Sequence, residues 1–415
     1  MNKTLFFSRC YYIIIFLAVI SAPFTAIPYF YITPLLLILW IIEGDWKTKW
    51  NRLEESQTLV ITGGLILFWF INVIGLLYYN DLIRGLMRTY DKLPFLVYPL
   101  VFFTLDKNFF TKEKIYTLLK GYLCATALML LICWGNAIIQ YLFTGYSKHF
   151  YYIYFSQFFG HPAYSTLSAC IAFSISFFFF NQSIGFKRWI WIFLIFLFTV
   201  SVYFLQSRSG ILAFLIIYVF SIIYYVKTHK KKGMYGLETI FLIFLFAISL
   251  SFFFPKRIDI NLKKIHTESF NFVDDILGQR YDIWSLSWDI AVQNKMLGIG
   301  TGYYVNNYLT KEGVDVFNQN QSFINTHNQF LQTFLEHGIF GFCLFFFLII
   351  YLFYYAIIKK NYLLLMLLIL MSVNIIFESM LERNRGIFTL TLMLCLFITK
   401  NNIFATVKKN NPIII

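Results

Sequence analysis

Residues 278–341 decide the fold of this chain, because they interrupt a sequence that otherwise consists of long apolar runs. The segment contains the stretches GQRYDIWSLSWDI (278–290), NKMLGIGTGYY (294–304) and THNQFLQTFLEHGIFG (326–341). These stretches carry charged, amide and hydroxyl side chains together with closely spaced glycines. An integral membrane protein retains such a polar segment only for a reason, so we expect its chemistry to be concentrated here.

The composition on either side of this segment is that of a polytopic membrane protein. The chain is 59% hydrophobic, 21% aromatic and only 13% charged, whereas soluble domains are about 25% charged. A helix needs roughly 20 apolar residues to cross a bilayer core of about 30 Å. We therefore predict an all-α fold with about twelve transmembrane helices, of which the second and fourth are short, at residues 10–27, 28–42, 58–79, 93–105, 115–142, 162–180, 189–206, 210–226, 237–254, 338–358, 362–380 and 386–399.

The distribution of lysine and arginine predicts the orientation, because short cytoplasmic loops are rich in both. A twelve-span topology with the N-terminus inside places most basic residues in cytoplasmic loops, and so explains the formal charge of +14. Scattered basic residues do not form a nucleic-acid recognition surface. This topology predicts three parts: nine spans in 1–254, an outer, periplasmic segment with short interfacial helices in 255–337, and three spans with a cytoplasmic tail in 338–415. If the cell is Gram-negative, this topology places the chain in the inner membrane and the outer segment in the periplasm.

Several arginines fall on the outer side, where this rule disfavours them. An anionic ligand at the outer membrane face is the simplest explanation for their positions. The alternative is that individual side chains extend to lipid phosphates, and it stays open for all except Arg208 and Arg280. The exceptions are Arg84, Arg88, Arg208, Arg280, Arg383 and Arg385.

Arg208 lies in the turn QSRSGILAF between two predicted spans, at the membrane edge. A charged side chain near the bilayer interior is costly and is usually paired or functional. The planar guanidinium can grip phosphate oxygens through two hydrogen bonds. An ion pair with Asp282 or Glu336 is the structural alternative.

Arg280 begins the helix-like stretch RYDIWSLSWDIAVQN, in which Ile283, Trp284 and Trp288 are spaced to form one apolar stripe. Such a helix suits the membrane interface. The glycines that follow in LGIGTG (297–302) permit a positive φ and close approach to a ligand or to a neighbouring helix.

The stretch THNQ predicts the start of a second short helix. Thr326 and Gln329 have the spacing of a capping box, so we expect a helix from His327 to about Gly338, which is only about 16 Å long. Such a helix is too short to span the membrane and should dip into the outer face or lie along it. His327 on the first turn would feel the positive helix end, which favours the neutral imidazole that a general base requires. A purely structural histidine is the alternative.

Two further histidines bear on this site. His337 lies near the predicted C-terminus of the same helix, so we interpret it as a helix-end residue and not as the base. His161 precedes Pro162 at the outer mouth of a predicted span and can line the same cavity. The outer segments contain no carboxylate pair suited to a divalent metal, and no metal or cofactor is predicted.

These residues resemble the O-antigen ligase and polymerase family of bacterial envelope proteins. His327 and Asn328 are followed by nine residues, Gly338, two residues and Gly341, which is similar to the ligase pattern. SRSG (207–210) also resembles the family's pattern.

The spacing from Arg280 to Trp284, followed by LGIGTG, is similar to the family as well. The chain departs from it at residues 294–296, where many relatives carry a proline.

The resemblance implies a metal-independent, inverting glycosyltransferase whose donor is a glycan linked to polyprenyl (undecaprenyl) diphosphate. In a ligase the acceptor is a hydroxyl of the lipid A core at the periplasmic face. Arg208 and Arg280 would hold the diphosphate, and His327 would be the base. The apolar helices, in contact with membrane lipids, would hold the polyprenyl tail. The other predicted substrate-binding residues are Asn328, Gln329, Trp284, Gly300, Gly302, Arg84, Arg88 and His161.

Three other functions remain open at this point. A polymerase of the same family would use a second lipid-linked glycan as its acceptor. A transporter or flippase also suits twelve spans, although the sequence lacks matched broken helices in its two halves. A non-catalytic scaffold would leave Arg208, Arg280 and His327 without a role.

Overall fold

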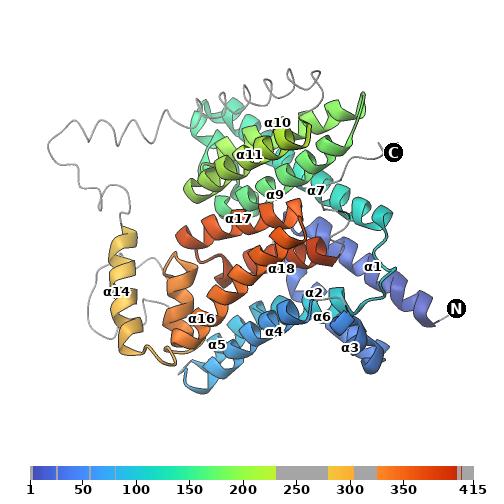
Figure 1. Cartoon of the computed structure of the whole chain (residues 1–415). Helices are drawn as coiled ribbons and strands as arrows, with labels where there is room; N and C mark the ends of the chain where they lie inside the picture. Colours follow the sequence, from blue (N-terminus) through green and yellow to red (C-terminus); the bar gives the residue numbers. More distant parts are fainter. Residues whose placement is uncertain are drawn as a thin grey trace.

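The computed structural model describes residues 3–24, 27–55, 58–79, 81–229, 279–302, 325–399 and 403. These parts form α-helices and short 3-10 helices, with no β-strand among them (Figure 1). The all-α prediction is therefore confirmed for the described residues. The predicted span at 237–254 lies outside them.

The N-terminal half contributes α1 (Lys3–Ser21), α2 (Ile27–Glu43), α3 (Trp46–Glu55), α4 (Leu59–Ile74), η1 (Gly75–Leu77), α5 (Leu82–Asp91), α6 (Pro94–Thr104) and α7 (Lys112–Thr144). The middle contributes η2 (Ser147–Phe150), α8 (Tyr152–Phe155), η3 (Gln157–Phe159), α9 (Pro162–Gln182), α10 (Lys187–Leu205) and α11 (Arg208–His229). The C-terminal part contains α14 (Gln279–Gln293), α16 (Gln329–Ile358), α17 (Tyr362–Phe377), η6 (Met380–Glu382) and α18 (Asn384–Thr399).

Each predicted apolar run within the described residues corresponds to a helix, but the number of spans is not confirmed. Seven described helices are long and apolar enough to cross a membrane. The pair α2 and α3, bent by 112°, allows an eighth, whereas α17 and α18 have only 16 residues each. The protein is thus a multi-pass membrane protein, and twelve spans remain a prediction.

The centre of the bundle is formed by α9 and α18, whose residues are almost completely buried. In Figure 1, α17 and α18 lie between the N-terminal helices and the group α9 to α11. The first turns of α9 carry small buried side chains, including Ser165, Ser168, Ala169 and Ala172. Small residues let helices approach closely in a membrane, so α9 can pack against α7, α10, α11, α17 and α18.

Polar contacts join the loops that the sequence places on the outer side, and these loops define what we call the outer end of the bundle. Arg385 at the start of α18 donates to the carbonyl oxygens of Pro23, after α1, and Phe159, before α9. Arg88 of α5 donates to the carbonyl oxygen of Glu382 in η6, 2.6 Å away. Three separate stretches of the chain therefore meet at this end.

The polar helix before Gly338 begins later than predicted. Asn328, and not Thr326, is the N-cap, since its side chain accepts a hydrogen bond from the backbone N–H of Leu331. His327 precedes the helix with a φ of 48°. The predicted capping box was wrong because an asparagine is at least as good a cap as a threonine and lies two residues nearer the helix.

The helical backbone breaks at Gly338, where the short polar helix was predicted to end, and an apolar helix continues from there to Ile358, so α16 is two helices joined at this break. Gly338 has φ 61° and ψ −158°, a combination that essentially only glycine adopts. A Cβ here would lie 2.3 Å from the carbonyl oxygen of Met296. We call residues 329–337 the short arm of α16; the long arm that follows is apolar.

Helix α14 packs against this short arm, as Figure 1 shows. Ile290 and Ala291 of α14 bury themselves against Leu335 of α16. Of the predicted apolar stripe, Ile283 is buried, Trp284 is half-buried, and Trp288 is exposed with its ring against Phe334. The buried face follows Ile283 and Ile290, which are two turns apart.

Candidate active site

Three predicted or newly found polar residues meet at the outer end. Nδ1 of His327 lies 3.0 Å from Oε2 of Glu378, and Nη2 of Arg280 lies 2.9 Å from Oε1 of the same carboxylate. His327 precedes α16, Arg280 is on the first turn of α14, and Glu378 follows the last residue of α17. One carboxylate therefore brings the predicted base and a predicted phosphate-binding arginine together.

Hydrogen bonds fix the loop that presents His327. The backbone N–H of His327 donates to Oδ1 of Asn325 at 3.1 Å, which supports the left-handed backbone of His327. Nε1 of Trp284 donates to the carbonyl oxygen of Thr326 at 2.7 Å. Helix α14 thus holds the loop through Trp284 and the carboxylate through Arg280. The site is therefore held by α14 on one side and by the end of α17, which carries Glu378, on the other.

The contact with Glu378 fixes the tautomer of His327. An ionised carboxylate only accepts hydrogen bonds, so Nδ1 carries the proton in this contact, and in the neutral imidazole Nε2 is the nitrogen with the lone pair. Burial raises the pKa of Glu378, but the hydrogen bond and charge of His327 and the charge of Arg280 outweigh it, and the pKa lies below its ordinary value. Glu378 is therefore a carboxylate near neutral pH.

A cavity of about 500 Å³ opens beside this group, and we call it the histidine cavity. Its walls include His161, His327, Glu378 and Arg383. Burial lowers the pKa of His161, whose imidazole also feels the charges of Glu378, His327, Arg383 and Arg280. Nδ1 of His161 accepts from the backbone N–H of Ala163 and so caps α9. The structure therefore brings His161 to the same cavity as His327, where it also has a structural contact.

A larger cavity of about 1350 Å³ adjoins the first, and we call it the α5 cavity. It is lined by charged residues of α5, including Arg84 and Arg88, and by apolar side chains of the same helix. Arg84 pairs with Asp81 at 3.4 Å and Arg88 with Asp91 at 3.3 Å. Arg383 and Arg385 line both cavities.

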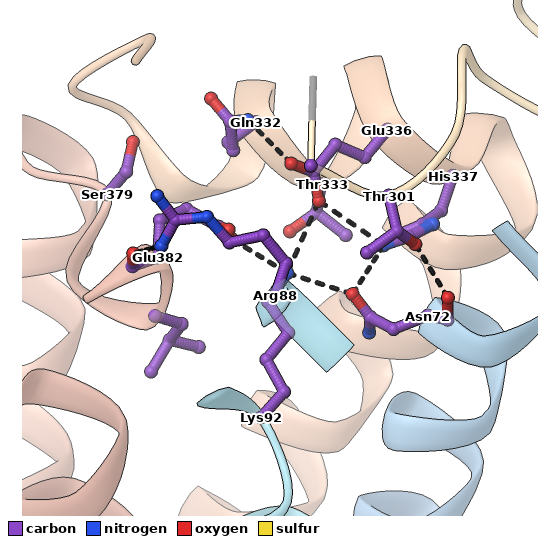
Figure 2. A network of polar contacts seen from close by, with 12 residues as sticks. Asn72, Arg88, Lys92, Thr301, Gln332, Thr333, Glu336, His337, Ser379 and Glu382 are labelled. Carbon is purple, nitrogen blue, oxygen red and sulfur yellow. Dashed lines mark hydrogen bonds and ion pairs between the residues drawn. The ribbon is translucent and has the colours of Figure 1, made fainter. Parts of the chain in front are cut away.

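A second, buried group of polar side chains centres on Lys92 (Figure 2). Nζ of Lys92 lies 2.8 Å from Oδ1 of Asn72, 3.3 Å from Oε2 of Glu336 and 3.0 Å from Oε1 of Glu382. His337 also reaches Asn72, with Nε2 3.0 Å from Oδ1. His337 is therefore more than a helix-end residue, because it is buried within this cluster.

The cluster holds the two chain segments that carry His327 and Glu378. Burial lowers the pKa of Lys92, but the charges of Glu336 and Glu382 outweigh it and raise the pKa. Burial and the charge of Glu336 raise the pKa of Glu382. A lysine that stays charged between two carboxylates joins the short arm of α16 to η6, just after Glu378.

Two predicted substrate-binding residues have structural contacts in the same region. The buried Gln329 donates to Oε1 of Glu382 at 3.0 Å and accepts from the backbone N–H of Leu381 at 2.8 Å. Asn328 caps α16. Their side chains position the loop that carries His327, and any contact with a substrate remains a prediction.

The predicted glycines adopt positive φ values, 99° at Gly300 and 96° at Gly302. Gly300 approaches the carbonyl oxygen of Gly75 and the side chain of Tyr79, and Gly302 approaches Arg88 and Gly85. Of the two roles left open for these glycines, close packing on a neighbouring element is the one seen among the described residues. Ligand contact remains a prediction.

Arg208 begins α11 and is exposed. Two residues later, a Cβ at Gly210 would lie 2.4 Å from Cγ2 of Thr166, in the second turn of α9. Arg208 therefore lies at the outer end, close to the start of α9, although no contact joins it to His327 or Arg280 in the described residues. Glu336, one of its predicted alternative partners, instead binds Lys92 and Gln332.

Sequence reasoning missed Glu378, Lys92 and Glu382. Glu378 was read as part of the predicted span 362–380, and Lys92 as the edge of the span 93–105. An ionisable residue at a membrane boundary is usually paired or functional, and this rule applied to acidic residues and lysines as well as arginines would have found all three. Among the described residues, no group of three or more histidine, cysteine or acidic side chains is arranged to bind a metal ion.

The fold and this site define a multi-pass membrane protein with a histidine, a carboxylate and several arginines gathered at one end of its helical bundle. Residues 192–346 match the model of the O-antigen ligase family, so the predicted resemblance is confirmed for this region. The matched part is less than half of the chain; it includes Arg208, Arg280 and His327 but ends before Glu378. No curated protein matches the chain.

This match supports an O-antigen ligase or polymerase type of function for the protein. Proteins of this type are glycosyltransferase-like enzymes that act on lipid-linked glycans and lipid acceptors.

Proposed function

We propose that this protein is a ligase that transfers a glycan from polyprenyl diphosphate to a hydroxyl of the lipid A core. The proposal is that the reaction takes place at the periplasmic face of the inner membrane. The observation that carries it is the hydrogen bond between Nδ1 of His327 and Glu378 at the wall of the histidine cavity. In the neutral imidazole this contact holds the proton on Nδ1, so Nε2 is the nitrogen that can accept a proton, as a general base requires.

In the proposed reaction the acceptor hydroxyl oxygen attacks the anomeric carbon of the donor sugar. The new C–O bond forms on the face opposite the leaving group, so the anomeric configuration inverts. Nε2 of His327 takes the hydroxyl proton, and Glu378 stabilises the imidazolium that results. The bond between the sugar and the diphosphate oxygen breaks, and its electron pair leaves with the polyprenyl diphosphate.

Arg280 and Arg208 are the proposed partners of the diphosphate. A guanidinium has five N–H donors, and Arg280 donates through Nη2 to Glu378 while its side chain remains 30% exposed. Its other donors can therefore stabilise the charge that develops on the leaving group. Arg208 is exposed at the same end of the bundle and would approach the diphosphate from α11.

The lipid A core is the proposed acceptor because the spacing around His327 resembles the ligase pattern. A polymerase would differ only in taking a second lipid-linked glycan at the same position. The two adjoining cavities accommodate two lipid substrates in either case. The transporter reading loses its support, since the family match is to a transferase.

The test is transfer by the purified protein in liposomes that contain a polyprenyl-diphosphate-linked glycan and either lipid A core or a second lipid-linked glycan. Transfer to lipid A core is expected, and His327→Ala should abolish it. His149→Ala is the matched control, because His149 lies in η2 against Tyr154 and lines neither cavity. Transfer only between lipid-linked glycans would show a polymerase, and full activity of His327→Ala would refute the assigned base.

A further inference from the structure

Arg383 lies where the histidine cavity and the α5 cavity meet, since its side chain lines both. It follows η6 directly and is exposed. Its charge acts on His161 across the histidine cavity. A cation in this position faces both substrate spaces at once.

The other arginines at these cavities have protein partners. Arg84 pairs with Asp81, and Arg88 pairs with Asp91. Arg385 is buried, and its guanidinium donates to backbone carbonyl oxygens. Arg383, by contrast, makes no side-chain hydrogen bond or ion pair with any residue that the structure describes. Among the arginines that line the two cavities, its guanidinium is thus the one whose donors face the cavities without a described protein acceptor.

The α5 cavity combines charge at its edge with an apolar wall. Its lining includes Phe30, Ile83, Leu86, Met87 and Leu93. Ile83 is 70% exposed and Met87 64% exposed, although both are apolar. An exposed apolar face on a short helix at a membrane boundary fits contact with a lipid chain. A hydrocarbon chain in this cavity would end beside Arg383.

We infer that Arg383 binds the diphosphate of the lipid carrier while the isoprenoid chain lies in the α5 cavity. This inference rests on the proposed function and assigns the two cavities within it. The guanidinium holds phosphate oxygens through paired hydrogen bonds. The sugar then extends from the diphosphate into the histidine cavity, where His327 and Glu378 line the wall.

This arrangement places the leaving group and the base on opposite sides of the reacting sugar carbon. The chain occupies the apolar cavity, the diphosphate lies at the junction, and the acceptor enters beside His327. The inversion proposed above requires such an order, because attack and departure occur on opposite faces of the sugar.

The inference is tested by binding of farnesyl diphosphate and of inorganic pyrophosphate to the purified full-length protein, which needs no transfer reaction. Arg383→Gln should weaken the binding of both probes at least tenfold. Arg383→Lys keeps the positive charge but lacks the paired donors of a guanidinium, so it should weaken the binding of both probes by an intermediate factor. Met87→Trp fills the α5 cavity, so it should weaken only farnesyl diphosphate. Arg52→Gln is the matched control, because Arg52 binds Thr104 and Asp106 on α6 and the loop after it.

Unchanged binding of both probes by Arg383→Gln would overturn the inference, as would an equal loss of both probes in Met87→Trp. The outcome is separate from that of the proposed function. A wild-type protein that binds farnesyl diphosphate through Arg383 but transfers no glycan would refute the transferase proposal and leave this site standing. If the wild-type protein transfers glycan and Arg383→Gln binds both probes as well as wild type does, the transferase proposal stands and the diphosphate site at Arg383 is refuted.

Discussion

The carboxylate of Glu378 lies 3.0 Å from Nδ1 of His327, so the loop after α17 orients an imidazole that precedes α16. This pairing fixes which ring nitrogen can accept a proton. The contact also orients a histidine whose side chain is 38% exposed. His327 lies inside the region that matches the family, whereas Glu378 lies beyond its end.

Replacing Glu378 by glutamine should lower the rate of transfer by about 10²-fold or more, since it removes the charge that stabilises the imidazolium and the acceptor that fixes the tautomer. Donor binding should change little. The measurement is kcat in the liposome assay alongside the Kd for farnesyl diphosphate. A rate within twofold of wild type would contradict the role proposed for the pair His327 and Glu378.

Arg280→Lys should also impair transfer severely, because an ammonium cannot hold Glu378 and phosphate oxygens at once in the geometry of a guanidinium. The expected loss is about 10-fold to 10³-fold in kcat/KM. Arg52→Lys, far from the site, is the control for the same chemical change. Free substitution by lysine would rule out the role proposed for this arginine.

The contribution of Glu378 to stability should depend on pH. Its pKa lies below the ordinary value of 4.5 because of His327 and Arg280, so the fold favours the charged form. This stabilisation is complete above the ordinary value and is lost as the pH falls through the lowered pKa. The difference in Tm between wild type and Glu378→Gln should be constant near neutral pH and shrink below about pH 4.5. A difference that does not change with pH would disprove this account.

Lys92→Met should destabilise the protein by about 3–5 kcal/mol, because it leaves the buried carboxylates of Glu336 and Glu382 without their cation. Lys92, Glu336 and Glu382 are all buried, with side-chain exposures of 2%, 2% and 4%. The triple variant with both glutamates changed to glutamine should recover much of this loss. Thermal unfolding in detergent measures both effects. A triple variant no more stable than Lys92→Met would contradict the ionic explanation.

Gly338→Ala should destabilise the protein by about 1–3 kcal/mol from backbone conformation alone. The contact of the added Cβ with the carbonyl oxygen of Met296, at 2.3 Å, adds to this cost. Gly135→Ala in α7 is the control, since a Cβ there meets nothing within 4 Å and alanine favours a helix. Equal Tm values for the two variants would argue against a required break in α16.

The positions of the helices could be predicted from the sequence, since apolar runs reflect the thickness of the bilayer. The start of α16 could not be predicted correctly, because Thr326 and Asn328 are both good caps and the choice depends on Asn325 and Ser379, which lie around them in the fold. The apolar stripe predicted along α14 likewise does not reveal which face of the helix meets the short arm of α16.

For the site, the unusual charges on the outer side pointed to Arg280 and His327, which the structure joins through Glu378. They did not point to Glu378 itself, because a carboxylate at the end of an apolar run reads as the edge of a span. Lys92 was hidden in the same way. Contacts between residues hundreds of positions apart leave no local pattern in a single sequence.

The cluster around Lys92 also bears on how the protein is made. Lys92 precedes Glu336 by 244 positions, so during synthesis it enters the membrane region long before either of its acidic partners exists. The lysine must remain at the aqueous interface until the last helices are inserted. The polar contacts of the outer end can therefore form only after the C-terminal helices have been made, and a truncated chain that lacks these helices leaves Lys92 without its acidic partners.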